Sequence, residues 1–510
     1  MAGANQKGIV NIDTIDGHQK EGLPKELRDE LDKLEKQFTV TTEKLKEITK
    51  RFQEELEEGL KENGKNIAMF VTWVLGFPTG EEKGSFLTVD LGGTNLRVCW
   101  ITLNGKTKDK EHDIVVKQDS YTMPGELKTG NASDLWSFIA QSLQKFIEKE
   151  NLTATPNEPL PLGFTFSYPA IQDYIDQGVL QTWTKGFDIE NVEGNDVASQ
   201  LRSAISDFNL SIEIVAVIND TTGAMIASAY NDPDTIVGAI FGTGCNAAYM
   251  DKISNIPKLK GKEQIQNLSP DTPMAINCEY GAFDNARKVL PITRYDENID
   301  ADSPRPGEQA FEKLSAGLYL GEIFRLIILD MHDRNLFLKD QDITKLKEPY
   351  SIDTAFLSSL EDDSTDSLTQ SSETFKSDFN LTFTEPELNF SRLLAHLIAI
   401  RGARLCACGV AAISRLTKTT TGHVAADGSV ANKHPRFKKR WGQALGEILD
   451  WSGEDINKAV DETGAPIVIT SAEDGSGVGA AVIAAMTLER WRKGHDAGIK
   501  GDGFEKVSGR

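Results

Sequence analysis

Cysteine is scarce in this chain of 510 residues, and its spacing is not that of a metal site or a disulfide framework. The five cysteines are Cys99, Cys245, Cys278, Cys406 and Cys408. No Cys-x-x-Cys pair occurs among them, and most lie in apolar runs. This pattern predicts reduced thiols in a buried core and a reducing compartment, so we expect a cytoplasmic protein. A redox-active Cys406-Ala-Cys408 pair is the less favoured alternative.

The chain also contains few histidines and carries no net positive charge. The seven histidines form no cluster with ligand spacing, which argues against a transition metal held by the protein. With 55 Lys and Arg against 77 Asp and Glu, the formal net charge is −22. Such an acidic surface disfavours nucleic acid and anionic membranes, so we expect neither as a partner. It does not exclude a bound nucleotide, because backbone amides and Mg²⁺ can set the local field at a site.

Signal-like and membrane-spanning segments are not expected. Residues 1–7 lack the apolar core of a signal peptide. We also identify no apolar run long enough to span a bilayer. The length of the chain exceeds one small domain and suits two large ones.

Glycine is concentrated in turns that predict phosphate binding. Residues 86–100 predict a strand, a Gly-Gly-Thr turn and a second strand, with β-forming residues on both sides. Gly92 and Gly93 allow backbone amides to point at an anion, and Asp90 is placed to hold a hydrated Mg²⁺. A dinucleotide-binding fold needs a helix after its glycines, so that interpretation fails. An ordinary hairpin with a glycine-rich turn is the alternative.

Two further segments strengthen the nucleotide interpretation. Residues 234–250 predict a second hairpin, with a Gly-Thr-Gly turn at 242–244. Two such hairpins predict two halves of similar topology that face one nucleotide. Residues 467–482 predict a strand, a turn and an Ala-rich helix, where Gly475, Gly477 and Gly479 allow close approach of a nucleotide. Tight helix–strand packing would use the same glycines.

Other segments carry weaker signals. Residues 26–63 have apolar residues at helical spacing. Residues 59–66 nearly match a P-loop, but they end in Asn66 and follow a helix, so we interpret them as a helix end with a glycine cap. Residues 358–380 are rich in Ser, Thr, Asp and Glu and predict an exposed loop or short frayed helices. The segment after Lys493 is glycine-rich and polar.

Five strings in order along the chain carry a resemblance to a known family. They are Leu162-Gly-Phe-Thr-Phe-Ser-Tyr-Pro169, Trp183-Thr-Lys-Gly-Phe187, Ile218-Asn-Asp-Thr-Thr-Gly223, Ile276-Asn-Cys-Glu-Tyr-Gly281 and Phe311-Glu-Lys313. The chain resembles the hexokinases, and most closely the fungal single-unit form, from about residue 35 to about residue 490.

The resemblance implies an α/β protein with a two-lobed actin-like, ribonuclease-H-like ATPase fold and a cleft between a small and a large domain. It implies ATP-dependent phosphorylation of glucose, fructose and mannose at the 6-hydroxyl, the first step of glycolysis. The partners would be a hexose and MgATP, and the protein a monomer or homodimer. We expect a flexible segment at 1–25, a large domain of 26–85 plus 219–470, a small domain of 86–218 plus 471–495, and a C-terminal tail at 496–510.

The resemblance also implies roles for individual residues. Asp220 would be the catalytic base, assisted by Lys185. The residues that would hold sugar hydroxyls are Ser167, Lys185, Asn219, Asp220, Asn246, Glu279 and Glu312. The residues that would surround ATP and its phosphates are Asp90, Gly92, Gly93, Thr94, Asn95, Thr243, Gly244, Asp427, Gly428, Ser429, Gly475 and Ser476. Asp90 would hold Mg²⁺ through water.

The same residues also have simpler interpretations. Asp220 follows an apolar strand, so a helix N-cap is its ordinary role. Lys185 would ordinarily be a solvated surface lysine. Arg97, just past the first turn, would pair with an acid or reach the phosphates.

Three functional alternatives stay open. Tyr168 and the 245–249 segment leave room for a glucose-restricted glucokinase of the same family. A sugar sensor with this fold and without catalysis is a second alternative, although Asp220, Gly92, Gly93 and Thr243 are all present. An actin-like or chaperone-like ATPase without a sugar site is the third.

Overall fold

The computed structural model describes residues 20–93, 95–106, 113–184, 186–472 and 475–507. Their strands form two larger sheets and one short pair. The first sheet has the order β1-β11-β10-β9-β12-β13 and the second has the order β4-β3-β2-β5-β8. The strands of the first sheet are β1 (Phe70–Leu75), β9 (Thr235–Phe241), β10 (Cys245–Lys252), β11 (Pro273–Asn277), β12 (Gly422–Asp427) and β13 (Ile467–Ser471). The remaining strands are β2 (Lys83–Leu91), β3 (Asn95–Asn104), β4 (Ile114–Thr122), β5 (Leu160–Phe166) and β8 (Ile212–Ile218), with β6 (Ala170–Ile171) paired to β7 (Val179–Leu180).

The two sheets share one topology. In the second sheet, β2, β3 and β4 form an antiparallel meander, and β5 and β8 then join β2 in parallel. In the first sheet, β9, β10 and β11 form the same meander, and β12 and β13 join β9 in parallel. β1 is added at the edge of the first sheet. Both predicted hairpins are therefore confirmed, together with the predicted repeat of topology.

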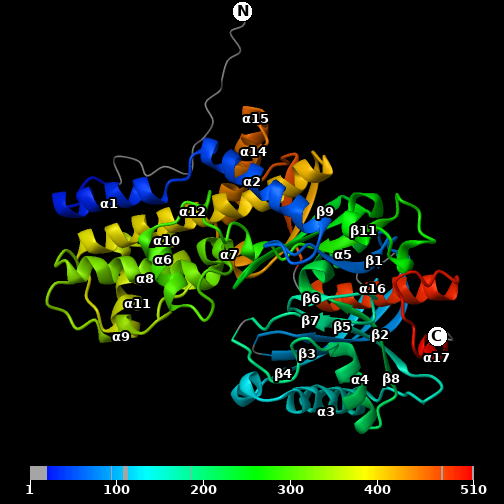
Figure 1. The fold of residues 1–510 in the computed structure, drawn as a ribbon. Coiled ribbons are helices and arrows are strands. Elements are labelled where there is room, and N and C mark those ends of the chain that lie inside the picture. The colour runs from blue at the N-terminus through cyan, green and yellow to red at the C-terminus, as the bar shows by residue number, and fades with distance from the viewer. Residues whose placement is uncertain (1–19, 94, 107–112, 185, 473–474, 508–510) are drawn as a thin grey trace, which may run out of the picture.

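Helices cover both sheets, and some of them pack together as a helical unit with its own core (Figure 1). The longer helices are α1 (Lys25–Phe38), α2 (Thr42–Lys61), α3 (Ala132–Glu150), α4 (Val197–Asp207), α5 (Asp220–Asn231), α8 (Gly317–Asp333), α11 (Thr369–Phe379), α12 (Glu385–Thr417), α14 (Phe437–Ile448) and α16 (Gly475–Arg492). The shorter helices are α6 (Arg294–Asp302), α7 (Ala310–Ser315), α9 (Thr344–Lys347), α10 (Thr354–Asp362), α13 (Ser429–Lys433), α15 (Gly453–Asp461) and α17 (Phe504–Val507). The helical unit consists of α1, α6, α8 to α11 and the first half of α12.

Two helices lie between the sheets and join the lobes. α5 packs on β9 and β10 of the first sheet, and α16 packs on β2 and β5 of the second. The two helices also pack on each other, which Figure 1 shows near the middle of the sheet region. Their contact is close because it uses glycine: a Cβ on Gly479 would lie 2.0 Å from the carbonyl oxygen of Gly223.

The longest helix forms part of the core. Among the described residues, α12 is long and apolar enough to cross a bilayer by length and composition. Its most apolar stretch is entirely buried inside the protein, as in the core helix of a soluble protein, which has the same length and composition. The prediction that no apolar run reaches this length is therefore wrong.

The segment at 358–380 is more ordered than its composition predicts. It forms the end of α10 and all of α11, so the short helices are confirmed and the exposed loop is wrong. Leu360, Leu368 and Phe375 are buried in the core of the helical unit. The Asp363 carboxylate accepts hydrogen bonds from the backbone N–H and hydroxyl of Ser371 at 2.8 and 2.6 Å. Apolar residues at helical spacing outweighed the polar composition.

The P-loop-like segment lies at a helix end, as predicted. α2 ends at Lys61, but its C-cap is Glu62 in an extended conformation, and Gly64 at φ +82° follows. The predicted glycine cap is therefore wrong in detail. Gly59 is instead a packing glycine inside the helix, because a Cβ there would lie 2.2 Å from the carbonyl oxygen of Ile67.

All five cysteines are buried and free, as predicted. Burial raises the pKa of both the Cys406 and Cys408 thiols to about 12. A thiol with such a high pKa is a poor nucleophile, which argues against the redox-active alternative.

Candidate functional site

Three amide side chains converge on the carboxylate of Glu279. Its Oε1 accepts hydrogen bonds from Asn219 at 3.3 Å, Asn246 at 3.2 Å and Asn277 at 3.0 Å. The Asn246 side chain also accepts from the backbone N–H of Glu279 at 2.9 Å. Glu279 has φ +53°, and this unusual backbone turns its side chain toward the network directly after β11. Such a network presents fixed acceptors and donors, which is the chemistry that a polyhydroxylated ligand requires.

Glu312 approaches the strand beside this network from α7. Its Oε2 accepts the backbone N–H of Cys245 at 3.1 Å, at the start of β10. A Cβ on Gly244 would lie 2.7 Å from the same oxygen, so the glycine lets the carboxylate approach the hairpin turn. The predicted sugar residues Asn219, Asn246, Glu279 and Glu312 therefore lie around one point on the first sheet.

Asp220 is the first residue of α5, and Asn219 is the N-cap. The Asn219 side chain accepts the Thr221 N–H at 2.9 Å, and an Asp220 oxygen accepts the same N–H at 2.7 Å. The capping role proposed as the alternative for Asp220 thus belongs to its neighbour. The Asp220 carboxylate lies at the N-terminal end of α5, the end that carries partial positive charge.

A cavity of about 530 Å³ lies beside Asp220. Its lining comes from both sheets and from the helices that follow them. The lining residues are Asp90, Arg97, Asp220, Ile240, Asp427, Gly428, Ser429, Asn432, Lys433 and Ser476. The Ser476 hydroxyl donates to Asp90 Oδ2 at 2.7 Å and links the start of α16 to the end of β2. Six of the predicted nucleotide and catalytic residues therefore share one cavity: Asp90, Asp220, Asp427, Gly428, Ser429 and Ser476.

The glycine turns of the two hairpins lie close to this cavity. In the first, the Gly92 N–H donates to the Asn95 carbonyl at 3.2 Å. In the second, the Gly242 N–H donates to the Gly244 carbonyl at 3.1 Å. A Cβ on Gly428 would lie 2.7 Å from the Gly242 nitrogen, so the turn after β12 packs directly on the second hairpin turn. The backbone carbonyl of Thr243 accepts the backbone N–H of Leu318 at 3.3 Å.

Tyr168 and Ser167 follow β5 of the second sheet. The Tyr168 hydroxyl donates to the Gly92 carbonyl at 3.4 Å and is buried. Burial, followed by the charges of Asp90 and Asp220, raises the pKa of Tyr168, so this hydroxyl stays protonated. Ser167 is also buried. The second sheet thus brings its own polar residues to the side that carries the cavity.

The remaining predicted residues are placed differently. Gly475 packs on α5, where its Cβ would lie 2.9 Å from the Ala224 Cα, and the described lining of the cavity does not include it. The packing interpretation therefore accounts for Gly475. No side chain lies within 4 Å of a Cβ built on Gly93 among the described residues. Thr94 and Lys185 lie outside the described residues.

The sequence interpretation missed four residues of this region. Asn277 and Thr221 belong to the amide network, where Asn246 Nδ2 donates to Asn277 Oδ1 at 2.8 Å and to Thr221 Oγ1 at 3.1 Å. Asn432 and Lys433 line the cavity one helical turn after Gly428. Asn277 and Thr221 stand inside the quoted strings, so their proximity to recognised residues was the available signal.

One histidine does join a potential ligand group, contrary to the expectation from sequence. His423 lies with Asp232 and Asp234 within 4.8 Å, and its Nδ1 is 2.5 Å from Asp232 Oδ2. The group lies at the starts of β9 and β12, at the end of the sheet away from the cavity. A histidine–carboxylate hydrogen bond explains it without a metal.

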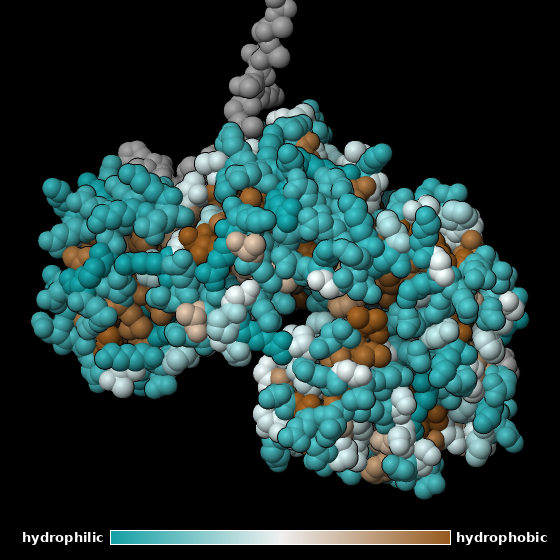
Figure 2. All heavy atoms as spheres, viewed as in Figure 1, coloured by the Kyte–Doolittle hydropathy of each residue, from teal (hydrophilic) through white to brown (hydrophobic). Residues whose placement is uncertain are grey.

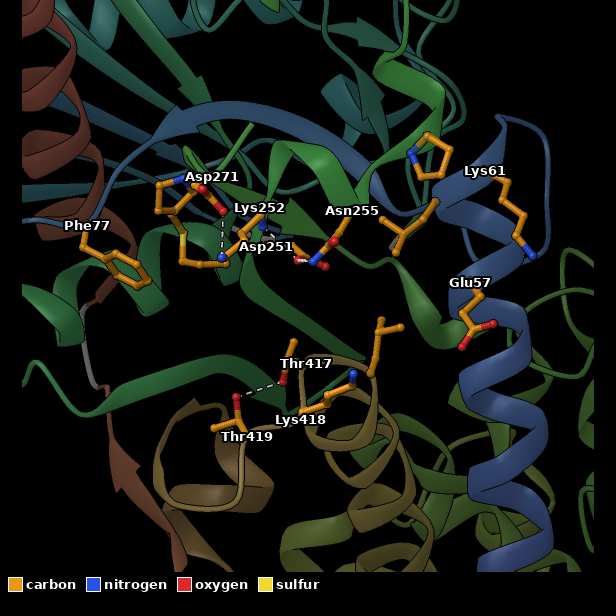
Figure 3. Close-up of a pocket in the computed structure, with 15 residues that line it drawn as sticks. Glu57, Lys61, Phe77, Asp251, Lys252, Asn255, Asp271, Thr417, Lys418 and Thr419 are labelled. Atoms are coloured by element: carbon orange, nitrogen blue, oxygen red, sulfur yellow. Dashed lines mark hydrogen bonds and ion pairs between the residues drawn. The ribbon is translucent and has the colours of Figure 1, made fainter. Parts of the chain in front are cut away.

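A second cavity of about 600 Å³ contains none of the predicted residues (Figure 3). It lies between the C-terminal ends of α2 and α12 and the segment after β10. Its polar groups largely satisfy one another: Lys252 pairs with Asp271 at 2.8 Å, and Asn255 donates to Asp251 at 2.7 Å. We therefore assign the functional site to the cavity beside Asp220. The face shown in Figure 2 is mostly hydrophilic and is indented where the lobes meet.

The duplicated sheet topology, with a nucleotide-type cavity between the halves, defines the two-lobed actin-like, ribonuclease-H-like class. The chain also matches two family models described as hexokinase, over residues 30–230 and 236–486. It is 52% identical over 485 residues to a hexokinase of Emericella nidulans, covering 94% of each chain. It is 49% identical over 480 residues to hexokinase-1 of Saccharomyces cerevisiae, covering 94% of this chain and 96% of the relative. The solved structure of a Schistosoma mansoni hexokinase complexed with glucose matches with a TM-score of 0.78 and 31% identity, over 90% of this chain and 99% of that chain. This chain belongs to the hexokinase family.

Proposed function

We propose that this protein transfers the terminal phosphoryl group of ATP to the 6-hydroxyl of glucose, and of fructose and mannose, releasing ADP. One observation carries the proposal. Asp220 lines the cavity that holds the predicted phosphate residues, while its neighbour Asn219 belongs to the amide network around Glu279. A base at this junction can contact both a sugar hydroxyl and the phosphoryl group that it attacks.

The amide and carboxylate network is the proposed sugar subsite. Asn246 and Asn277 are buried, and they are fixed by their bonds to Glu279. A sugar that left these groups unpaired would lose about 1–3 kcal/mol for each one. The network therefore supplies selectivity for hexose hydroxyl patterns.

Phosphoryl transfer depends mainly on position and charge. Asp220 would accept the hydroxyl proton late, as the new O–P bond forms, and such assistance is worth roughly 10²–10⁴-fold. The larger share would come from in-line placement and from the amides and cations around the phosphates. The turns at Gly92 and Gly242 would supply such amides, and the side chains of Arg97 and Lys433, which line the cavity, would supply such cations.

The donor set of the cavity fits Mg²⁺. Asp90, Asp220 and Asp427 supply carboxylate oxygens, the ligand type that this ion prefers. Asp90 would hold the ion through water, in the orientation that Ser476 fixes by its 2.7 Å bond. The ion would neutralise phosphate charge that the three carboxylates would otherwise repel. We further propose a cytoplasmic location and a monomer or homodimer with no nucleic-acid or membrane partner.

The test measures ADP release from MgATP with glucose, fructose or mannose. The wild type should turn over all three sugars. In Asp220→Ala, kcat should fall by several orders of magnitude, because loss of a general base costs roughly 10²–10⁴-fold or more. Asp271→Ala is the matched control, because this exposed aspartate lies at the second cavity and should leave kcat unchanged.

The other outcomes separate the alternatives. Turnover with glucose alone would restrict the enzyme to a glucokinase. Glucose-induced tryptophan fluorescence change without turnover would favour a sensor. ATP hydrolysis that ignores sugar would overturn the proposal.

A further inference from the structure

A buried cluster of charged side chains lies outside the described site. At its centre is Glu361, whose side chain is 2% exposed. Its carboxylate accepts hydrogen bonds from both terminal nitrogens of Arg440, one of them at 3.1 Å, and lies 2.6 Å from His396 Nδ1. His434 Nε2 is 3.3 Å away, and Arg436 is 3.7 Å away at the rim. Burial alone would raise the pKa of Glu361, but the nearby His396 and His434 rings and the charge of Arg440 hold it well below its ordinary value.

The cluster joins three parts of the chain that are distant in sequence. Glu361 belongs to α10, His396 to α12, and Arg440 to α14. His434 is the C-cap of the short helix α13. Its Nδ1 accepts the backbone N–H of Arg436 at 3.3 Å, which fixes the ring at the connection between α13 and α14.

α13 runs directly from this cluster to the cavity. The helix has five residues, and it begins at Ser429, which lines the cavity. Its Asn432 side chain donates to Asp427 Oδ1 at 3.1 Å, and its Asn432 N–H donates to the Gly428 carbonyl at 3.0 Å. Gly428 is packed against Phe241 and Gly242. One end of α13 is therefore held by the hairpin turn, and the other end lies at His434, whose Nε2 is 3.3 Å from Glu361 Oε2.

We propose that Glu361 is a positioning residue for nucleotide: through His434 and Arg440 it sets the direction of α13 and so the place of Asp427, Gly428 and Ser429 around the phosphates. This inference rests on the proposed function. A five-residue helix has little stability of its own, so its placement depends on what holds its ends. Removing the carboxylate would leave Arg440, which is 1% exposed, as an uncompensated buried cation that must move.

The test is Glu361→Gln, which keeps the shape and removes the charge. We expect KM for ATP to rise about tenfold, while kcat and KM for glucose stay within about twofold, because the sugar network lies on other elements. Binding of a non-hydrolysable ATP analogue, measured by calorimetry, should weaken by a similar factor. Glu361→Asp keeps the charge at a shorter reach, so its KM for ATP should lie between those of the wild type and Glu361→Gln.

A matched control separates positioning from general stability. Glu322→Gln makes the same change at a buried glutamate that pairs with Arg325 and accepts the Tyr350 N–H at 2.7 Å, within the helical unit. It should lower the melting temperature and leave KM for ATP unchanged. His434→Leu is the second variant: it leaves the Glu361–Arg440 pair in place, cuts the link to α13, and should also raise KM for ATP.

Two outcomes would overturn the positioning role. One is a folded Glu361→Gln or His434→Leu protein whose KM for ATP and analogue affinity match the wild type. The other is an equal rise in KM for ATP in Glu322→Gln. Absence of sugar-dependent turnover in the wild type would instead count against the proposed function, and analogue binding would still decide the role of Glu361.

Discussion

At the residue scale, the Glu279 carboxylate holds the amide side chains of Asn219 and Asn246, and Glu312 accepts the backbone N–H of Cys245 beside them. Asp220, Asn219, Glu279 and Glu312 were predictable because each stands in a distinctive string. Asn277 was missed because its role depends on the pairing of β10 with β11, which places it opposite Ala248. That register is a property of the folded sheet, and no local pattern in the sequence encodes it.

Glu361 shows that a local sequence pattern also fails to predict a buried charge. Its sequence neighbourhood is acidic and polar, which predicted an exposed loop or short frayed helices, whereas its cationic partners lie 35 to 79 residues away. The unfolded carboxyl has an ordinary pKa of 4.5 and the folded one titrates well below it. The unfolded chain therefore binds more protons between these values. The stabilisation by the carboxylate is fully present above about pH 4.5 and is lost as the pH falls through the folded pKa.

This sign gives a prediction for stability. The difference in free energy of unfolding between the wild type and Glu361→Gln should be larger near about pH 6 than near about pH 4. The groups that face Glu361 are Arg436, Arg440, His396 and His434, and the two arginines stay charged across this range. Urea unfolding of both proteins at the two pH values measures the difference. A difference that is constant with pH would show that the folded carboxyl does not titrate below its ordinary range.

At the element scale, the hairpins and the repeated topology were predictable, because strand periodicity and turn glycines are local signals. The contact between α5 and α16 was not predictable, because nucleotide binding and tight packing would use the same glycines. The structure resolves this residue by residue: Gly475 and Gly479 serve helix packing, while Ser476 between them contacts Asp90 in the cavity. One turn of helix thus carries both roles on different faces.

The packing role makes a matched pair of substitutions possible. Gly479→Ala would place its Cβ 2.0 Å from the Gly223 carbonyl oxygen, so α5 and α16 must separate. We expect a loss of about 1–3 kcal/mol in stability and weaker activity, because α5 carries Asp220. Gly477→Ala would meet its nearest atom at an ordinary 3.6 Å, and should be neutral or stabilising by up to about 1 kcal/mol. Thermal unfolding of the two variants measures this difference in stability. Equal melting temperatures would contradict the packing argument.

At the scale of the whole molecule, the proposed sugar subsite draws on both lobes. Ser167 follows β5 of the second sheet, whereas Asn246 lies in β10 and Glu279 follows β11 of the first. Besides the α5–α16 contact, the lobes are joined by the segment between β1 and β2. A ligand that bonds to both sheets at once binds more tightly when the lobes lie closer together. Binding therefore shifts the protein toward that arrangement, to an extent set by the difference in affinity between the two arrangements.

We therefore predict that glucose lowers the radius of gyration of this protein in small-angle X-ray scattering, and that Ser167→Ala reduces this change. Loss of one hydroxyl bond across the cleft should also raise KM for glucose about tenfold, because an unpaired buried group costs about 1–3 kcal/mol. Ser358→Ala is the control, since this serine lies in the helical unit and its hydroxyl bonds only to the Thr354 carbonyl among the described contacts. A glucose-induced change that is as large in Ser167→Ala as in the wild type would contradict the role of Ser167 in bringing the lobes together.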